Sequence, residues 1–127
     1  MLFRSKYFEQ VQKVGQVTGS THAMLAFTPE GKFLGGTEDV GRHVALDKLI
    51  GMRAMKKWGP VVVFLSSRAS YEMVQKAAVT GIEILFAISA PTNRALRLAK
   101  ECDLTLSAFC RDNRANIYNA PERLLNL

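Results

Sequence analysis

Two continuous apolar runs constrain the fold of this 127-residue chain more than any other feature of its sequence. Residues 61–65 read Val-Val-Val-Phe-Leu, and residues 82–88 are nearly as apolar. Between the runs, residues 70–80 have the composition of a helix that is closed by Gly81. Strands that are apolar on both faces must be covered on both faces, as in the parallel sheets of α/β proteins. The pattern therefore predicts a βαβ unit.

The rest of the chain adds helices and strands around this unit. Apolar residues at steps of three and four predict a helix over residues 2–14. The turn residues 29–32 then predict a hairpin between strands at 23–28 and 33–34. Further elements are expected as helices at 44–57 and 91–101 and as strands at 104–109 and 115–118, and residues 121–125 are expected to form a short helix or an ordered tail. Together they predict an α/β fold, a three-layer α/β/α sandwich with a mixed sheet.

Composition and charge limit the domain count and the classes of partner. With 48% hydrophobic and 22% charged residues, the composition predicts a single domain over residues 1–127. The net charge of +6 favours anionic partners, but Lys and Arg are dispersed, which argues against a nucleic-acid-binding arm. Signal-peptide and membrane-spanning segments are not expected, and two cysteines without a Cys-x-x-Cys pair fit a cytoplasmic location.

Two strand-to-helix junctions carry similar polar groups. Residues 66–70 read Ser-Ser-Arg-Ala-Ser, and residues 89–94 read Ser-Ala-Pro-Thr-Asn-Arg. Ligands of open α/β sheets bind beyond the carboxyl ends of strands, where helix N-termini present free N–H groups. Ser67, Arg68 and Ser89 are therefore candidates for contacts to a phosphate. Ser and Thr are also ordinary helix caps, so capping alone is the competing interpretation.

Residues 37–43 form a denser polar cluster that contains Arg42 and His43. These two side chains could face an anion or a reacting group, although a turn with Asp39 as a helix cap would also explain the cluster. Neither a Gly-Lys-Ser/Thr ending nor a Gly-x-Gly-x-x-Gly motif is present. His22 precedes a strand, where a structural histidine is the commoner outcome. Neither histidine has the Cys and His companions that zinc needs, so no metal site is expected.

A basic turn near the end of the chain is the last candidate. Arg111 and Arg114 flank Asp112 and Asn113. They could grip a phosphate while Phe109 or Tyr118 stacks on a base, and a solvated hairpin tip is the alternative. Cys110 lies in this region and Cys102 at the end of a helix; a free cysteine is more often a small buried hydrophobe than a reactive group.

These blocks, taken together, resemble the formate dehydrogenase accessory proteins of the FdhD type. The resemblance is carried by residues 18–23 (TGSTHA), 38–43 (EDVGRH), 45–48 (ALDK), 66–70 (SSRAS), 72–77 (EMVQKA) and 89–92 (SAPT), and by Phe109, Arg111, Arg114, Asn116 and Tyr118. Several ordered blocks from residue 18 to the end of the chain make the match more specific than any single motif.

The resemblance implies both a fold and an activity. The fold is expected to be similar to that of cytidine deaminases, without their zinc. The expected activity is that of a cytoplasmic, homodimeric sulfurtransferase that passes sulfur from a cysteine desulfurase to the bis-molybdopterin guanine dinucleotide form of the molybdenum cofactor. Formate dehydrogenase requires that cofactor, and GDP is expected to mimic it.

The resemblance also assigns residues, and this chain departs from the family at several positions. Residues 109–114 are similar to the family's cofactor-binding stretch, and a second set of candidates for the same pocket comprises His22, Arg42, His43, Ser67, Arg68 and Ser89. The family's persulfide-forming cysteine lies in a Cys-x-x-Cys loop upstream of the block at 18–23. Residues 1–17 of this chain contain no cysteine, so no catalytic residue is assigned here. Full-length members are roughly twice this length, so the chain resembles their C-terminal domain. The chain also has Val44 where the family usually has asparagine, and it has Ser20 and Ser67 where the family often has glycine.

Two alternatives remain beside a sulfurtransferase domain. The first is a non-catalytic module that binds or protects a nucleotide or the molybdenum cofactor, and the missing thiol loop favours it for this chain alone. The second is a small basic RNA-binding domain, which the sequence supports less because aromatic and basic residues are not interleaved on one element.

Overall fold

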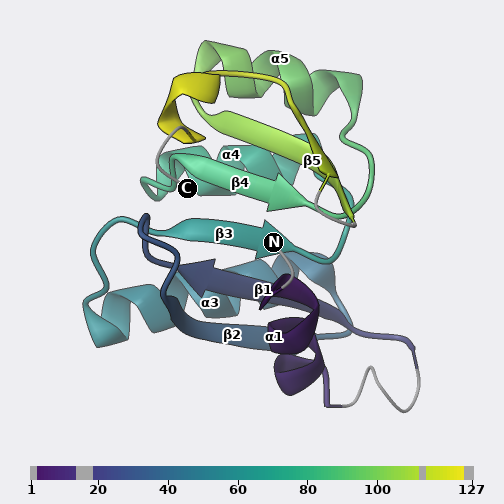
Figure 1. Cartoon of the computed structure of the whole chain (residues 1–127), viewed down its shortest axis with the longest axis vertical. Helices are drawn as coiled ribbons and strands as arrows, with labels where there is room; N and C mark the ends of the chain where they lie inside the picture. The colour runs from purple at the N-terminus through teal and green to yellow at the C-terminus, as the bar shows by residue number, and fades with distance from the viewer. Residues whose placement is uncertain (1–2, 14–18, 112–113, 125–127) are drawn as a thin grey trace.

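A single mixed sheet forms the centre of the molecule (Figure 1). The computed structural model describes residues 3–13, 19–111 and 114–124, and the side chains of residues 7–13, 19–108 and 115–122. Its six strands have the spatial order β2-β1-β3-β4-β5-β6. Their bounds are β1 His22–Phe27, β2 Phe33–Asp39, β3 Val62–Leu65, β4 Ile84–Ala87, β5 Thr105–Arg111 and β6 Arg114–Ile117. The helices are α1 Phe3–Val11, α3 Arg42–Lys56, α4 Tyr71–Val79 and α5 Asn93–Glu101, followed by the 3-10 helix η1 Pro121–Leu124.

The strand directions confirm the predicted βαβ unit and the mixed sheet. β1 is antiparallel to both of its neighbours, β2 and β3, while β3, β4 and β5 run parallel to one another, and β6 returns antiparallel to β5. It follows that β2, β3, β4 and β5 all point in the same direction. Their carboxyl ends therefore lie at one edge of the sheet, on the right in Figure 1.

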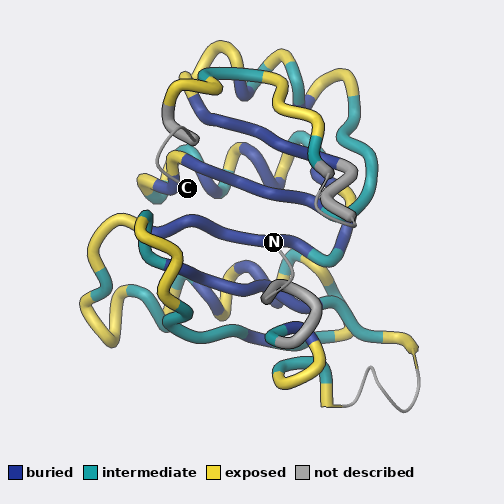
Figure 2. Tube along the Cα trace, viewed as in Figure 1, coloured by how far each residue is buried: buried dark blue, intermediate teal, exposed yellow. Residues whose placement is uncertain are grey.

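The two faces of the sheet are covered unequally. Helices α3, α4 and α5 pack on one face, where Leu46, Met73 and Ala95 join a core with Met24 and Leu85. On the other face, α1 contributes Phe8 to a second core made largely of aromatic residues. The central strands β1, β3 and β4 are almost completely buried, whereas the edge strand β2 is mostly half-buried (Figure 2). The expected α/β sandwich is confirmed, with one of its outer layers reduced to a single helix among the described residues.

The aromatic core follows directly from the apolar runs in the sequence. Phe64 of β3 and Phe86 of β4 face each other in register, and their rings stack with centroids 4.6 Å apart. Phe27 of β1 extends the cluster, with its ring centroid 5.2 Å from that of Phe64. Each large apolar side chain that is buried in this way stabilises the fold by about 1.5–3 kcal/mol. The cluster joins the antiparallel and the parallel halves of the sheet.

Strand β2 is longer than the two residues expected from the sequence, because it continues through both glycines to Asp39. A Cβ atom on Gly36 would lie 2.7 Å from Cγ2 of Val11, and one on Gly35 would lie 3.0 Å from the Trp58 ring. The glycines therefore allow α1 and the end of α3 to pack closely on the strand, and they do not form a turn. The interpretation of Asp39 as a helix cap is wrong, since the N-cap of α3 is Gly41.

In the described part of the chain, every helix is too short or too polar to cross a lipid bilayer.

Candidate anion-binding site

Three helices begin at the edge of the sheet where the parallel strands end. α3 follows β2, α4 follows β3 and α5 follows β4, so their N-termini lie along the same edge. The first N–H groups of a helix lack intrahelical acceptors, and the helix dipole places about half a positive charge at this end. This edge therefore attracts anions before any side chain is considered.

The loops at this edge are held in place by backbone hydrogen bonds. The loop after β3 and the loop after β4 are joined by a bridge between Ala69 and Pro91, in which the Thr92 N–H donates to the Ala69 carbonyl at 3.1 Å. Ser66 is fixed to the start of β1, since its hydroxyl oxygen accepts from the Ala23 N–H at 2.8 Å and its own N–H donates to the Ala23 carbonyl at 3.0 Å. The N-termini of α4 and α5 are thereby kept side by side next to β1.

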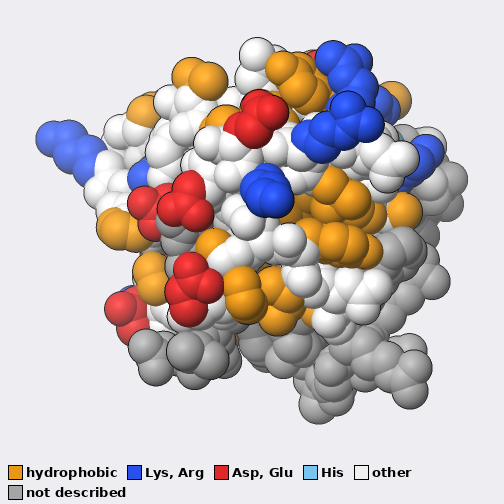
Figure 3. Space-filling model, turned by 90° about the horizontal axis from the view of Figure 1, so that it is seen from above, with side chains coloured by type: hydrophobic (Ala, Val, Ile, Leu, Met, Phe, Trp, Pro, Cys, Tyr) orange, Lys and Arg blue, Asp and Glu red, His pale blue; other side chains and the backbone are white. Residues whose placement is uncertain are grey.

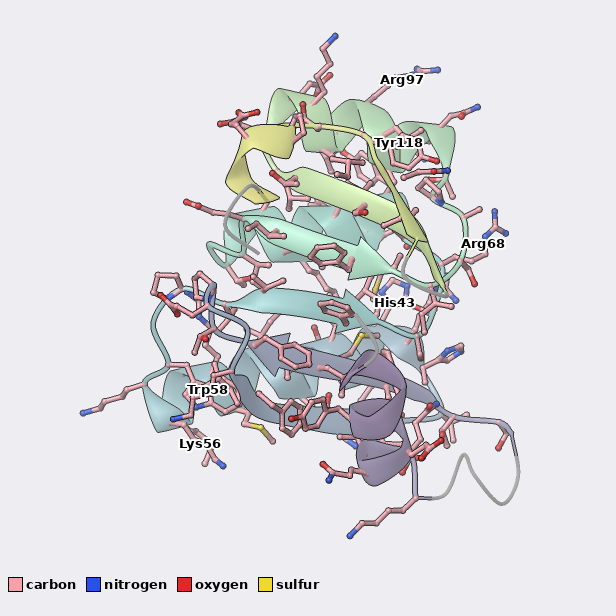
Figure 4. The ribbon with its side chains drawn as sticks, in the orientation of Figure 1. His43, Lys56, Trp58, Arg68, Arg97 and Tyr118 are labelled. Carbon is pink, nitrogen blue, oxygen red and sulfur yellow. The ribbon has the colours of Figure 1, made fainter. Side chains whose placement is uncertain are left out.

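A cavity of about 240 Å³ lies at this edge, and it contains four of the residues singled out from the sequence. Its lining consists of His22, Arg42, Ser67, Arg68, Ser70 and Thr92. The side chains come from the start of β1, the first residue of α3 and the two loops that precede α4 and α5. His43 and Ser89 are not among the lining residues. His43 is the second residue of α3, and Figure 4 shows it with Arg68 at the same edge.

Some hydroxyl groups of the cavity hydrogen-bond to the protein backbone, and another does not. Thr92 is a true helix cap, because its hydroxyl oxygen accepts from the Ala95 N–H at 3.1 Å. Ser67 is almost completely buried, and its hydroxyl donates to the Arg68 carbonyl at 3.2 Å. Ser70 occupies the N-cap position of α4, but its hydroxyl makes no capping bond. The Ser70 Oγ atom is buried and lies close enough to the Glu72 carboxylate to lower its pKa, but no described atom meets it with good hydrogen-bond geometry, so a ligand in the cavity could use it.

The acidic residues next to Arg42 in the sequence are already engaged. Asp39 forms an ion pair with Lys48 at 2.6 Å, and Glu38 accepts a hydrogen bond from the Thr21 hydroxyl. The bond from Lys48 and the N–H of Gly41 lower the pKa of Asp39 below its ordinary value of 3.8. Both carboxylates thus have partners of their own, and the Arg42 side chain lines the cavity.

The face seen in Figure 3 shows the same asymmetry of charge. Most of its Lys and Arg side chains lie on the right, the side on which the strands end in Figure 1, and most of its Asp and Glu side chains lie on the left. Two arginines, a histidine and three helix N-termini around a small cavity suit a phosphate or diphosphate group. The described residues contain no group of three or more His, Cys, Asp or Glu side chains that could hold a metal ion.

Sequence reasoning missed a group of side chains beside the cavity. The Arg94 guanidinium carbon lies 4.5 Å from the centre of the Tyr71 ring. Glu72 is held close by, and its pKa is lowered by its own backbone N–H, by the Ser70 hydroxyl and by the charges of His43 and Arg94. These residues come from the first turns of three helices. Only the packing of those helices brings them together, so no local pattern could have indicated the group.

The basic turn near the end of the chain lies partly outside the described residues. Asp112 and Asn113 are not described, and neither are the side chains of Phe109, Cys110, Arg111 and Arg114. The backbone shows where the stretch is located: β5 runs parallel to β4 and ends at Arg111, and β6 starts at Arg114, both at the cavity edge (Figure 1).

Cys102 lies away from the cavity. It caps the carboxyl end of α5, while the cavity lies at the amino end of that helix. Its side chain is exposed and unpaired with any described cysteine, so the interpretation of this residue as a buried hydrophobe is wrong.

Comparison with known proteins agrees with both the fold and the motif blocks. The model of the FdhD/NarQ family matches residues 2–125. A solved structure from Desulfotalea psychrophila, described as a formate dehydrogenase accessory protein, is 33% identical and superposes with a TM-score of 0.89. The match covers 97% of this chain and 55% of that protein, so the chain spans about half the length of this relative. The chain belongs to the FdhD/NarQ family.

Proposed function

We propose that this domain holds the guanine-dinucleotide form of the molybdenum cofactor, bis-molybdopterin guanine dinucleotide, as the substrate of a sulfurtransferase that serves formate dehydrogenase. One observation carries the proposal: His22, Arg42 and the adjacent pair Ser67 and Arg68, which come from three separate parts of the chain, line one cavity at the N-termini of three helices. A dinucleotide brings several phosphates, and this cavity offers the groups that bind phosphate best. The description of the Desulfotalea psychrophila relative as a formate dehydrogenase accessory protein supports the same role.

The residues of the cavity have distinct tasks in this proposal. Arg42 and Arg68 neutralise phosphate oxygens, and a guanidinium can hold two of those oxygens at once. The N–H groups at the starts of α4 and α5 and the Ser70 hydroxyl complete the contacts. Arg111 and Arg114, whose backbone lies at the same edge, are proposed to reach a second part of the same ligand.

Sulfur donation is proposed to involve a cysteine desulfurase and a persulfide on the full-length protein, which we expect to be a cytoplasmic homodimer. The one described thiol, Cys102, lies at the opposite end of α5 from the cavity. The part of the reaction that falls to the described residues is therefore to bind and orient the acceptor. The same observation favours the second candidate, a module that carries or protects the cofactor without moving sulfur. An upstream Cys-x-x-Cys in the intact reading frame would favour the sulfurtransferase.

Calorimetric titration of the chain with GDP, with ADP as the comparison, tests the binding proposal. The chain is expected to bind GDP more tightly than ADP. Arg42→Ala, Arg68→Ala, Arg111→Ala and Arg114→Ala are each expected to weaken GDP binding about tenfold, since a hydrogen-bonded charge pair contributes about 1.5–3 kcal/mol.

Arg97→Ala is the matched control, because Arg97 is an exposed arginine of α5 that does not line the cavity (Figure 4). This variant is expected to bind GDP like the parent. Absence of GDP binding, or equal binding by the Arg97, Arg42 and Arg68 variants, would show that the cavity is not the nucleotide site.

A further inference from the structure

The two edge strands of the sheet differ in how far they are open to another strand. At the β2 edge, the Lys48 side chain donates to the Glu38 carbonyl at 3.2 Å, and the pairing with β1 is irregular between Ala26 and Phe27. Charged side chains and irregular pairing are features by which proteins discourage the addition of strands to an edge. The other edge is β6, and within the described part of the chain no strand pairs with its outer side.

The backbone of β6 turns the polar groups of Ile117 toward this open edge. From Asn116 onward the pairing with β5 is regular, and the Asn116 carbonyl accepts from the Ser107 hydroxyl of β5 at 3.0 Å. Two residues later, the Tyr118 N–H donates to the Leu106 carbonyl at 2.8 Å. In an antiparallel pair, successive residues point their backbone groups in opposite directions. The N–H and the carbonyl of Ile117 therefore point away from β5.

The side chains beside this edge are apolar on one face of the sheet and basic on the other. Ile117 is 46% exposed and Tyr118 is 40% exposed. Ile117 lies on the same face as Ala115, which packs against the aromatic core, because alternate residues of a strand share a face. On the opposite face, helix α5 carries two exposed basic side chains, Arg97 and Lys100.

Helix α5 lies close to this edge. The side-chain amide of Asn119 donates to the Ala99 carbonyl at 3.1 Å, which ties the chain after β6 to the last turn of α5. Figure 4 shows Arg97 and Tyr118 at the same end of the molecule. Figure 3 looks onto that end: a hydrophobic patch lies beside Lys and Arg side chains, and most Asp and Glu side chains lie on the other side. The charge of this surface is complementary to that of an acidic partner.

We propose that the outer edge of β6 is a docking site for an extended, acidic segment of a partner protein, which adds to the sheet as a further strand. Hydrogen bonds to the Ile117 backbone supply the pairing, as in other complexes that form by strand addition. The side chains of an added strand alternate between the two faces, so its apolar residues lie beside Ile117 and its acidic residues beside Arg97 and Lys100. The surface therefore fits a segment in which apolar and acidic residues alternate. The site shares no residue with the cavity, so the inference does not depend on the proposed function.

The test uses a short, fluorescently labelled peptide in which Glu and Val alternate, and it measures binding by fluorescence anisotropy. One control peptide has Lys in place of Glu, and a second has Pro in place of Val. The parent chain is expected to bind the Glu-Val peptide about tenfold more tightly than either control. The Lys-Val peptide is repelled by the basic side chains, and the Glu-Pro peptide lacks the N–H groups that a strand needs.

Two variants test the backbone and the charges separately. Ile117→Pro removes the outward N–H and leaves the bonds to β5 in place, since an edge strand tolerates proline whose missing N–H faces solvent. It is expected to weaken binding of the Glu-Val peptide about tenfold. Arg97→Glu combined with Lys100→Glu is expected to reverse the preference, so that the Lys-Val peptide binds more tightly than the Glu-Val peptide.

The matched control is Lys32→Glu combined with Lys57→Glu, which reverses two exposed lysines that lie away from β6 and α5. This variant is expected to keep the parent's preference for the Glu-Val peptide. Thermal unfolding of each variant verifies that it is folded.

The proposal is overturned if the parent does not bind the Glu-Val peptide, or if folded Ile117→Pro binds it as the parent does. It is also overturned if the chain binds single-stranded polyuridine in place of the peptide, which would identify the basic surface as a nucleic-acid site. Sedimentation of the chain alone tests the remaining occupant. A dimer that Ile117→Pro converts to a monomer would show that a second copy occupies the edge, and would overturn the proposal as well.

Discussion

Asp39 shows how a single side chain connects the fold to the site. It ends β2, pairs with Lys48 of α3 at 2.6 Å and accepts from the Gly41 N–H at 3.0 Å. The carboxylate thus fixes the turn from which Arg42 enters the cavity. Thr37 adds a second connection between the same two elements, because its buried hydroxyl donates to the Ala45 carbonyl at 2.6 Å. The first residues of α3 are held by these contacts.

The lowered pKa of Asp39 predicts how stability depends on pH. Its folded pKa lies below the ordinary value of 3.8, mainly because of the bond from Lys48. The ionised form is therefore favoured by folding, and its contribution is fully present above the ordinary pKa and is lost as the pH falls through the folded pKa. We expect Asp39→Asn to lower the urea midpoint at about pH 7, by a difference from the parent that shrinks as the pH falls below the ordinary pKa of 3.8.

Urea unfolding of the parent and of Asp39→Asn across this pH range measures the effect. Lys48→Met provides the control background, in which Asp39→Asn should cost less, because the bond from Lys48 is gone and only the backbone N–H groups of Val40 and Gly41 still stabilise the carboxylate. A difference between parent and variant that stays constant from neutral to acidic pH would contradict this account.

At the residue scale, the sequence indicated which types of side chain lie at the site, but not which atoms those side chains contact. The hydroxyls of Ser70 and Thr92 looked equivalent as helix caps, yet only Thr92 makes the capping bond. Whether an N-cap hydroxyl turns toward its helix or toward a cavity depends on neighbours that lie far away in the sequence. The proximity of Glu72, His43 and Arg94 could not be predicted for the same reason.

Two glycines, Gly36 in strand β2 and Gly51 in helix α3, differ in whether there is room for a side chain. Replacing Gly36 tests close packing, whereas replacing Gly51 tests helix propensity. A Cβ on Gly36 would lie 2.7 Å from Val11 Cγ2 and 2.8 Å from the Met24 carbonyl oxygen. A Cβ on Gly51, inside α3, would meet no atom within 4 Å. One glycine is therefore required by the packing of α1 on the sheet, and the other is not.

We expect Gly36→Ala to destabilise the protein by about 1–3 kcal/mol, because either α1 or the sheet must shift. Gly51→Ala is expected to stabilise it by about 0.4–1 kcal/mol, since alanine favours the helix and restricts the unfolded chain. Chemical denaturation of both variants measures the two effects. Equal effects of the same sign would contradict the packing argument.

At the element scale, the sequence predicted whether a segment is a helix or a strand better than it predicted where that segment begins and ends. The α-helices and most strands were expected from periodicity or apolar runs, and most bounds shifted by one to three residues, while η1 falls where a short helix or an ordered tail was expected. β2 is the exception, since its pair of glycines gave no strand signal. Pairing with β1 and cover from α1 and Trp58 make it a strand, and these are tertiary effects.

At the scale of the whole molecule, the α/β sandwich followed from strands that are apolar on both faces. The strand order did not, because no local pattern indicates that β1 lies between β2 and β3. That order is what brings His22 to the cavity edge, since β1 starts where β2 and β3 end. The site is therefore a product of topology, assembled from residues that range from His22 to Thr92.

The central claim is that this edge of the sheet binds the phosphates of a guanine nucleotide. Backbone amide NMR spectra of the ¹⁵N-labelled 14.1 kDa chain, recorded as GDP is added, test it most directly. We predict that the largest shifts occur at the amides of His22, Arg42, Arg68, Ser70 and Thr92. Shifts confined to the opposite edge of the sheet or to the outer face of α3 and α4, or spectra that do not change, would contradict the account.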